Sequence, residues 1–218
     1  TPSGQWVNAT AGFSISKYTG TGSAATVGHG LGAKPDLIMV KELGDVGNWL
    51  VYHKDVGAEY YMALNDDIAK TDNNAIWNDT EPTNTVFTVG TAGDVNGDGG
   101  TFITYAWTAI PGYSAFGKYA GGGAKPFLYL GFRPKFIMIK ATTSGRNWII
   151  VDSERDPNNG DMDPLYANTS VAEQNHNALD ILSNGFKIVN DGYSDYNVDA
   201  DLIYAAFAEH PVKTARAK

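Results

Sequence analysis

The chain of 218 residues contains no cysteine. This absence excludes disulfide bonds, thiolate zinc sites and cysteine nucleophiles. No apolar run approaches the roughly 18 residues that a membrane-spanning helix needs. Positive charge is also scarce, since 16 Lys and Arg stand against 24 Asp and Glu and leave a net charge of −8. Nucleic-acid phosphates and anionic membranes repel such a chain, so we expect no nucleic-acid binding and no membrane insertion.

Two kinds of residue are abundant instead. There are 25 glycines, and aromatic residues make up 12% of the chain. Strand-forming residues alternate with clusters of Gly, Asn, Asp and Thr, which predicts an all-β fold with many turns. The first residue is Thr1, and no basic segment followed by an apolar one begins the chain. We therefore expect no signal peptide.

One stretch occurs twice and organises the chain. Residues 32–41 and 131–140 both carry a proline, then four apolar residues, then a lysine. Four successive apolar residues between strand breakers are typical of a strand that is buried on both faces. Each half of the chain therefore has its own predicted central strand, at residues 37–40 and 136–139.

Further matches follow in the same order through both halves, so we interpret the chain as a tandem duplication. The sequence predicts two tandem antiparallel β-sandwich-like repeats with long loops. Their ranges are 12–111 and 112–211, after a lead-in at 1–11 whose Trp6 packs onto the first repeat, and before a basic, frayed tail at 212–218. Residues 173–182 are the only predicted helix. Residues 53–85 and 152–184 match poorly, and such loops on a rigid scaffold are the expected place for specificity.

Asp94, Asn96 and Asp98 resemble the start of a calcium loop, with oxygen-bearing side chains at alternate positions. The position where the loop needs a bidentate glutamate holds Tyr105 instead. Asn, Asp and Gly also form ordinary turns. The pattern favours a turn and leaves a Ca²⁺ site as an alternative, and we expect no other cofactor.

No catalytic motif is present. The segments 28–32 and 121–123 are rich in glycine but lack the Lys-Ser/Thr of a phosphate loop. The four histidines show no metal-ligand spacing, and no Gly-x-Ser-x-Gly elbow occurs. We therefore expect a protein that is not an enzyme, although a facing pair of carboxylates would be visible only in three dimensions.

Trp77, Asn78 and Asp79 form the one candidate ligand-binding group. They lie in a polar stretch, residues 66–81, that we expect to be a long surface loop. An exposed tryptophan flanked by Asn and Asp suits stacking on a sugar ring and hydrogen bonding to its hydroxyls. The alternative is a tryptophan that anchors its own loop into the core. We expect Trp49, Trp107 and Trp148, which lie in or beside repeated strands, to pack in the core.

Several segments together resemble a domain in virion structural proteins of marine bacteriophages, where it occurs in tail-fibre-like proteins. The segments are 12–14, 18–20, 28–32, 38–41, 77–79, 86–88, 93–96 and 206–218. Asp98 departs from the small residue expected at its place. The resemblance covers nearly the whole chain and brings no catalytic or ligand residues with it.

The resemblance implies a surface-exposed virion component with a role in host-cell attachment. Its implied partners are other virion subunits, in a homo-oligomer that is a trimer in fibres of this kind, and a receptor or glycan on the host. Two alternatives stay open, a purely structural virion subunit and a depolymerase that degrades surface glycans.

Overall fold

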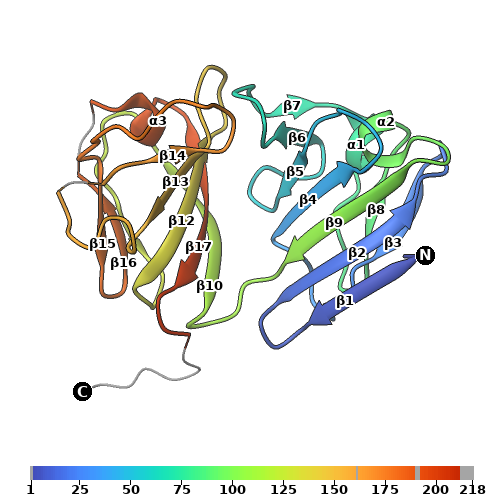
Figure 1. Cartoon of the computed structure of the whole chain (residues 1–218), viewed down its shortest axis with the longest axis horizontal. Coiled ribbons are helices and arrows are strands. Elements are labelled where there is room, and N and C mark those ends of the chain that lie inside the picture. The colour runs from blue at the N-terminus through green and yellow to red at the C-terminus, as the bar shows by residue number, and fades with distance from the viewer. Residues whose placement is uncertain (1, 161, 190–191, 212–218) are drawn as a thin grey trace. The chain divides into compact units, whose positions relative to one another are not determined.

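The structure is a computed structural model that describes residues 2–160, 162–189 and 192–211 (Figure 1). The fold is all-β, with antiparallel sheets. Its three helices within the described ranges have four residues each, α1 Asn74–Trp77, α2 Gly93–Asn96 and α3 Ser194–Asn197. None of the described helices is long and apolar enough to cross a membrane. The tail that we predicted at 212–218 lies outside the described residues.

The chain forms two compact units. The first comprises residues up to 65 together with 70–109, and the second comprises 66–69 and the residues from 110 onward. The strands of the first unit are β1 Gly4–Asn8, β2 Phe13–Thr19, β3 Ala25–Gly28, β4 Leu37–Glu42, β5 Leu50–His53, β6 Tyr60–Ala63, β7 Thr71–Asp72, β8 Val86–Val89 and β9 Thr101–Trp107. Those of the second are β10 Ser114–Ala120, β11 Phe127–Tyr129, β12 Pro134–Ala141, β13 Ile149–Asp152, β14 Leu165–Tyr166, β15 Leu179–Leu182, β16 Gly185–Ile188 and β17 Asp201–Ala208.

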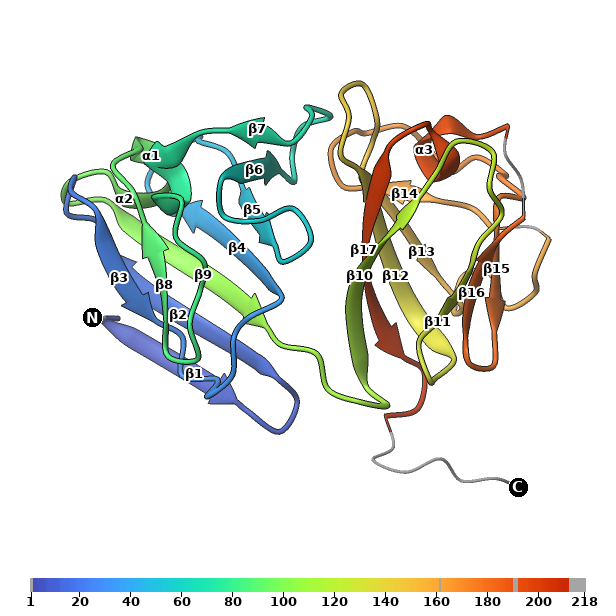
Figure 2. The ribbon, with the colours of Figure 1, turned by 180° about the vertical axis from the view of Figure 1, so that it is seen from behind.

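The first unit has a main sheet and a smaller second layer. The main sheet has the strand order β1-β2-β9-β4-β5-β6-β7, and the second sheet pairs β3 with β8. Figure 2 shows β3 and β8 in front of β2 and β9. Tyr18 on β2 meets Phe87 on β8 edge-on, with ring centroids 6.4 Å apart, and so joins the two layers.

The second unit is layered in the same way. Its main sheet has the order β10-β17-β12-β13-β14, and its second sheet has the order β11-β16-β15. One core lies between them, because Ile137, Val151 and Leu202 from the main sheet cluster with Leu179 and Phe186 from the second. The apolar area removed from water in such a core, at about 25 cal/mol per Å², is the main stabilising contribution to the fold.

Strands that hold the same place in the two main sheets follow the same order. The run β2-β9-β4-β5-β6 in the first unit corresponds to β10-β17-β12-β13-β14 in the second. Tyr119 also meets Phe186 edge-on at 6.5 Å, as Tyr18 meets Phe87.

The first predicted central strand is buried as expected, because Leu37, Ile38, Met39 and Val40 on β4 are at most 8% exposed. In the second, Ile137 to Ile139 on β12 are at most 7% exposed, but Phe136 is half-buried. The lysine after each run turns back over the next hairpin. Lys41 Nζ donates to the carbonyls of Glu42 and Asp45, and Lys140 Nζ donates to that of Ala141. These bonds satisfy carbonyls at the turn that would otherwise lack a partner.

Each unit also has a clasp between its β2-type strand and a helical turn. Tyr18 Oη donates to the Val95 carbonyl of α2 at 2.5 Å, and Tyr119 Oη donates to the Tyr196 carbonyl of α3 at 2.8 Å. Within α2, Asn96 is 1% exposed. Its side-chain amide donates to the Ser23 and Gly90 carbonyls, and its oxygen accepts the Thr21 N–H.

One predicted element is wrong. Residues 173–182 contain no helix, because Leu179 and Ile181 alternate with Asp180 and Leu182 at strand period and form β15. The lead-in at 1–11 contains strand β1, which pairs along β2 as the edge of the main sheet. Trp6 on β1 is 64% exposed, so our expectation that it packs onto the first unit is also wrong.

Candidate functional site

Trp77 does not form the predicted surface site. It is the last residue of α1, is 2% exposed, and meets Tyr52 edge-on with ring centroids 6.3 Å apart. Trp77 therefore fits the alternative interpretation, a tryptophan that anchors its own loop into the core. Asn78 and Asp79 are exposed and left-handed, with φ of 53° and 46°, at the end of the helix. The stretch 66–81 is not a plain loop either, because it contains β7 and α1.

The residues of the possible calcium loop do not act together as ligands. Asp94 and Asn96 lie in α2, and Asp98 is exposed after it. The oxygen of the Asn96 side chain already accepts the Thr21 N–H at 2.9 Å, so it is not offered to a cation. Among the described residues, no group of three or more His, Asp or Glu side chains could hold a metal ion.

Two of the three tryptophans expected in the core lie at the surface of the first unit. Trp148 is 1% exposed, but Trp49 and Trp107 are half-buried. They stack with Tyr105 and Phe13 on the face of the main sheet that points away from β3 and β8. The ring centroids are 5.0 Å apart for Phe13–Trp107 and 6.1 Å apart for Trp49–Tyr105. The same face carries the apolar side chains Ile15, Met39 and Ile103, and Ile103 lies between Lys17 and Lys41.

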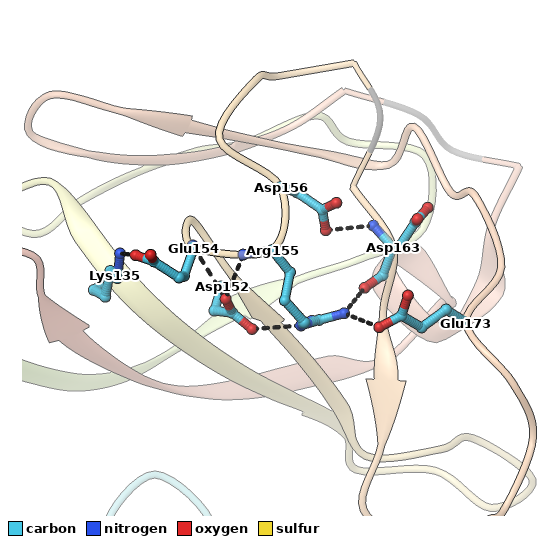
Figure 3. Close-up of polar contacts among 7 residues, drawn as sticks. All are labelled: Lys135, Asp152, Glu154, Arg155, Asp156, Asp163 and Glu173. Atoms are coloured by element: carbon cyan, nitrogen blue, oxygen red, sulfur yellow. Dashed lines mark hydrogen bonds and ion pairs between the residues drawn. The ribbon is translucent and has the colours of Figure 1, made fainter.

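Charged side chains hold the poorly matching loop after β13 (Figure 3). Arg155 Nε pairs with Asp152 Oδ2, and its Nη1 pairs with Glu173 Oε1, each at 2.7 Å. Nη1 also donates to the Asp163 carbonyl at 2.8 Å. Partial burial tends to raise the pKa of Asp152, but hydrogen bonds from the Arg155 backbone and side chain outweigh it and hold the pKa below its ordinary value.

The first unit holds its own loop differently. Glu81 Oε2 accepts from Lys34 Nζ at 2.7 Å and from Tyr52 Oη at 2.6 Å, and Glu81 Oε1 accepts the Ala58 N–H. Both networks pair carboxylates with cations or N–H donors that keep them charged. A general acid requires the opposite, a carboxyl whose pKa is raised. The arrangement therefore suits holding loops in place better than proton transfer.

The most ligand-like surface of the second unit is the outer face of its second sheet. Phe127 and Tyr129 alternate with inward-facing Leu128 on β11, and are 44% and 70% exposed. The strand register aligns Phe127 with Lys187 and Asp180, and aligns Tyr129 with Gly185 and Leu182. We call Phe127, Tyr129, Asp180, Leu182 and Lys187 the aromatic–polar face.

Gly185 allows the two strands of this face to lie close together. A Cβ atom built at Gly185 would lie 2.0 Å from the Leu128 carbonyl oxygen and 3.2 Å from the Phe127 ring, so only glycine allows β11 and β16 to come this close. Gly185 itself is buried.

A groove of about 380 Å³ continues the aromatic–polar face at Asp180. It is lined by Asn159, Gly160, Asn177, Asp180 and Val189. Asn159 exchanges two hydrogen bonds with the Ile181 backbone, at 2.8 and 3.0 Å, and so fixes the groove wall to β15. The groove thus adds amide and carboxylate groups to the exposed rings. Four of its five lining residues lie within 152–184, one of the two stretches in which the sequence predicts specificity.

Phe127 and Tyr129 could not be recognised as exposed from the sequence. The run Phe127–Leu130 is apolar at every position, and such a run does not reveal which side chains face outward. Only the pairing of β11 with β16 distinguishes the exposed rings from the partly buried leucines, Leu128 and Leu130.

Residues 2–211 match the model of a family described as a domain of unknown function, DUF7483. The chain belongs to this family. The DUF7483 domain extends through both units and contains the aromatic–polar face and the groove. No curated protein and no solved structure matches the chain.

Proposed function

We propose that the chain is an attachment module of a virion, built as two tandem β-sandwich-like repeats, which binds carbohydrate on a host surface. The duplication is supported by contacts that recur at matching positions, above all the Tyr18–Phe87 and Tyr119–Phe186 pairs and the two tyrosine clasps. The resemblance to tail-fibre-like virion proteins of bacteriophages supports the place in a virion and an oligomer with other subunits.

The observation that carries carbohydrate binding is the aromatic–polar face. A sugar ring presents C–H groups on its faces and hydroxyls around its rim. Tyr129 and Phe127 offer rings to the C–H groups. Lys187 offers donors to the hydroxyls, Asp180 offers acceptors, and Asn177 offers both. A glycan chain that lies along this face and enters the groove would meet both kinds of group.

Binding rather than catalysis is the function that this chemistry favours. Glu81 and Asp152, one carboxylate from each loop network, are held in ion pairs and hydrogen bonds that lower their pKa values, so both are poor proton donors. The face itself needs no cofactor to bind a sugar. Release of reducing ends from a bound polysaccharide would show a depolymerase instead.

The test is binding of the whole chain to an array of bacterial surface polysaccharides. We expect the replacement Tyr129→Ala to weaken binding at least tenfold, with an unchanged melting temperature because the ring is 70% exposed. Trp6→Ala is the matched control, because it also removes an exposed aromatic ring but lies on β1 of the first unit. Equal binding by the wild type and Tyr129→Ala would refute the proposed site.

A second candidate function, a structural virion subunit, is favoured by the outer face of the first main sheet. An antiparallel sheet usually has polar side chains on a face that meets water. Here Phe13, Trp49, Tyr105 and Trp107 are stacked among aliphatic side chains, as in surfaces that pack against protein. A chain that assembles normally but binds no polysaccharide would favour this candidate.

A further inference from the structure

The second sheet of the second unit ends in β11. Within the described residues β11 pairs with β16 and with no other strand (Figure 2). The Leu130 N–H, just after β11, donates to the Asn184 carbonyl in the turn before β16. Because the direction of hydrogen bonding alternates along an antiparallel strand, Leu128 also bonds to β16. The backbone N–H and C=O groups of Phe127 and Tyr129 therefore point to the open edge.

The other end of β11 gives the same alternation. There the Pro126 carbonyl accepts the Ile188 N–H, so residue 126 faces β16 like residues 128 and 130. Among the described residues, no hydrogen bond reaches the backbone groups of Phe127 or Tyr129. The edge thus offers two donors and two acceptors that the unit itself does not use, and such an edge is a ready site for strand pairing.

The first unit has the same edge, and there it can be compared residue by residue. Gly28 on β3 follows the residue that pairs with Phe87, and Tyr129 on β11 follows the residue that pairs with Phe186. The two phenylalanines hold the same place in their units, because each meets the tyrosine of the matching clasp edge-on. Gly28 is therefore the counterpart of Tyr129.

The first unit closes this edge from within, and the second does not. The Gly28 carbonyl accepts from Gln5 Nε2 at 2.9 Å and from Ser16 Oγ at 3.2 Å. Gln5 belongs to β1, a strand without a counterpart in the described part of the second unit. Gly117 stands at the place of Ser16, two residues before the clasp tyrosine, and has no hydroxyl. The Tyr129 carbonyl therefore lacks both donors.

A second copy of the chain is the occupant that this edge fits. If its β11 lies antiparallel to the first with Leu128 at the centre, Phe127 of each copy lies opposite Tyr129 of the other. Each such pair exchanges both of its backbone hydrogen bonds. The rings, which are 44% and 70% exposed in one chain, then form aromatic cross-strand pairs, a favourable combination. No charged side chain faces a like charge across the seam, because Lys187 lies one strand away on β16.

We infer that β11 is a pairing edge, at which two copies of the chain join about a two-fold axis at Leu128 and unite their aromatic–polar faces. Such an isologous contact is the commonest way in which identical chains associate. The backbone bonds lie in the plane of the sheet and the rings stand off its outer face, so pairing leaves the rings accessible. A glycan on the joined face would contact rings of both copies, and this last step rests on the proposed function.

Cysteine cross-linking tests the register, since the chain has no cysteine of its own. An equal mixture of the variants Phe127→Cys and Tyr129→Cys should form disulfide-linked dimers on mild oxidation, because strand partners lie about 5.5 Å apart between Cα atoms. Each variant alone should cross-link little, because diagonal neighbours lie about 7–8 Å apart. The matched control is a mixture of Thr26→Cys and Gly28→Cys, at the closed edge of β3, and it should not cross-link.

The mass in solution, without polysaccharide, tests the pairing itself. Light scattering of the wild type should rise toward twice 23.4 kDa as the protein concentration increases. Phe127→Ala and Phe127→Pro both lose the ring, but only proline also loses the N–H that faces the edge. We expect Phe127→Ala to dimerise at higher concentration than the wild type, and Phe127→Pro to keep the mass of one chain with native circular dichroism.

Three results would overturn the inference. They are a wild type that stays monomeric, equal dimerisation by Phe127→Ala and Phe127→Pro, and cross-linking of the mixture that is no greater than that of either variant alone. Failure of the proposed function looks different, because the chain would then dimerise and cross-link as expected but bind no polysaccharide. A monomeric chain that binds polysaccharide would refute the pairing edge and leave the proposed function standing.

Discussion

His29 is a single residue whose environment makes the first unit sensitive to acid. It is fully buried, its Nδ1 accepts the Leu31 N–H, and its Nε2 lies 3.2 Å from the Thr83 carbonyl. These partners fit the neutral ring with its proton on Nε2. Burial lowers the pKa of His29, and the hydrogen bond to Thr83 only partly opposes this.

The first prediction follows from this shift. Between the lowered pKa and the ordinary value of about 6.5, the unfolded chain binds more protons than the folded one, so stability falls as the pH falls through that window. We expect the midpoint of urea unfolding to decrease from pH 7 to pH 5 in the wild type and to change less in His29→Gln. The control His210→Gln, at an exposed histidine, should behave like the wild type. A parallel decline in all three proteins would exclude His29 as the cause.

Asn96 and Asn197 offer a second prediction, because matching residues make unequal contacts. Asn96→Ala removes the partner of three backbone groups, the Ser23 and Gly90 carbonyls and the Thr21 N–H. We expect the free energy of unfolding to fall by about 2–4 kcal/mol, at about 1 kcal/mol for each bond lost. Asn197 donates to the Ala124 carbonyl, so Asn197→Ala should cost about 1 kcal/mol. Urea titrations measure the two losses. An equal loss of unfolding free energy in the two variants would contradict the stronger role of the Asn96 side chain.

At the scale of elements, Arg155 determines how firmly the loop after β13 is held. Arg155→Met keeps much of the side-chain volume but loses the ion pairs to Asp152 and Glu173 and the bond to the Asp163 carbonyl. We expect faster amide hydrogen exchange across residues 152–173, with little change in β12 or β17. The control Lys135→Met removes the exposed pair with Glu154, which should matter little. Unchanged exchange in Arg155→Met would show that the loop is held by packing alone.

The elements also show what a sequence can predict. The buried strands β4 and β12 were predicted because four apolar residues between breakers fit only a strand with two covered faces. Residues 173–182 were misread as a helix because Ala, Glu and Leu have good helix propensity, whereas pairing with β16 favours a strand there. Trp6 was expected to pack onto the first unit but is exposed, whereas for Trp77 the sequence left both a surface site and a core anchor open and the structure shows it buried. The sequence around a tryptophan in a polar stretch does not indicate whether its ring faces the core or the solvent.

The candidate site was less predictable than the fold. The sequence predicted specificity in 53–85 and 152–184, and the second of these stretches includes the groove residues Asn159, Asn177 and Asp180. It did not reveal Phe127 and Tyr129. Their aromatic–polar face exists only because the register of β11, β16 and β15 brings its residues side by side. Register depends on pairing between segments that are far apart in the chain, and a single sequence does not state that pairing.

For the whole molecule, we predict that calcium does not contribute to stability. A ligand that binds only the folded state raises the melting temperature, and the rise grows with the logarithm of the ligand concentration above its Kd. Because the Asn96 side chain is committed to backbone groups, the melting temperature should be the same in CaCl₂ and in EDTA. A shift of several degrees that Asp94→Asn abolishes would show a cation site at α2 and contradict this account.

Carbohydrate binding by the complete chain is the central claim, and one measurement tests it most directly. Polysaccharides from bacterial surfaces are immobilised, and the affinities of the wild type, Tyr129→Ala and Trp6→Ala are compared on the same samples. The account predicts that at least one polysaccharide binds the wild type and Trp6→Ala equally, and Tyr129→Ala at least tenfold more weakly. Binding that survives Tyr129→Ala, or that Trp6→Ala abolishes instead, would contradict it.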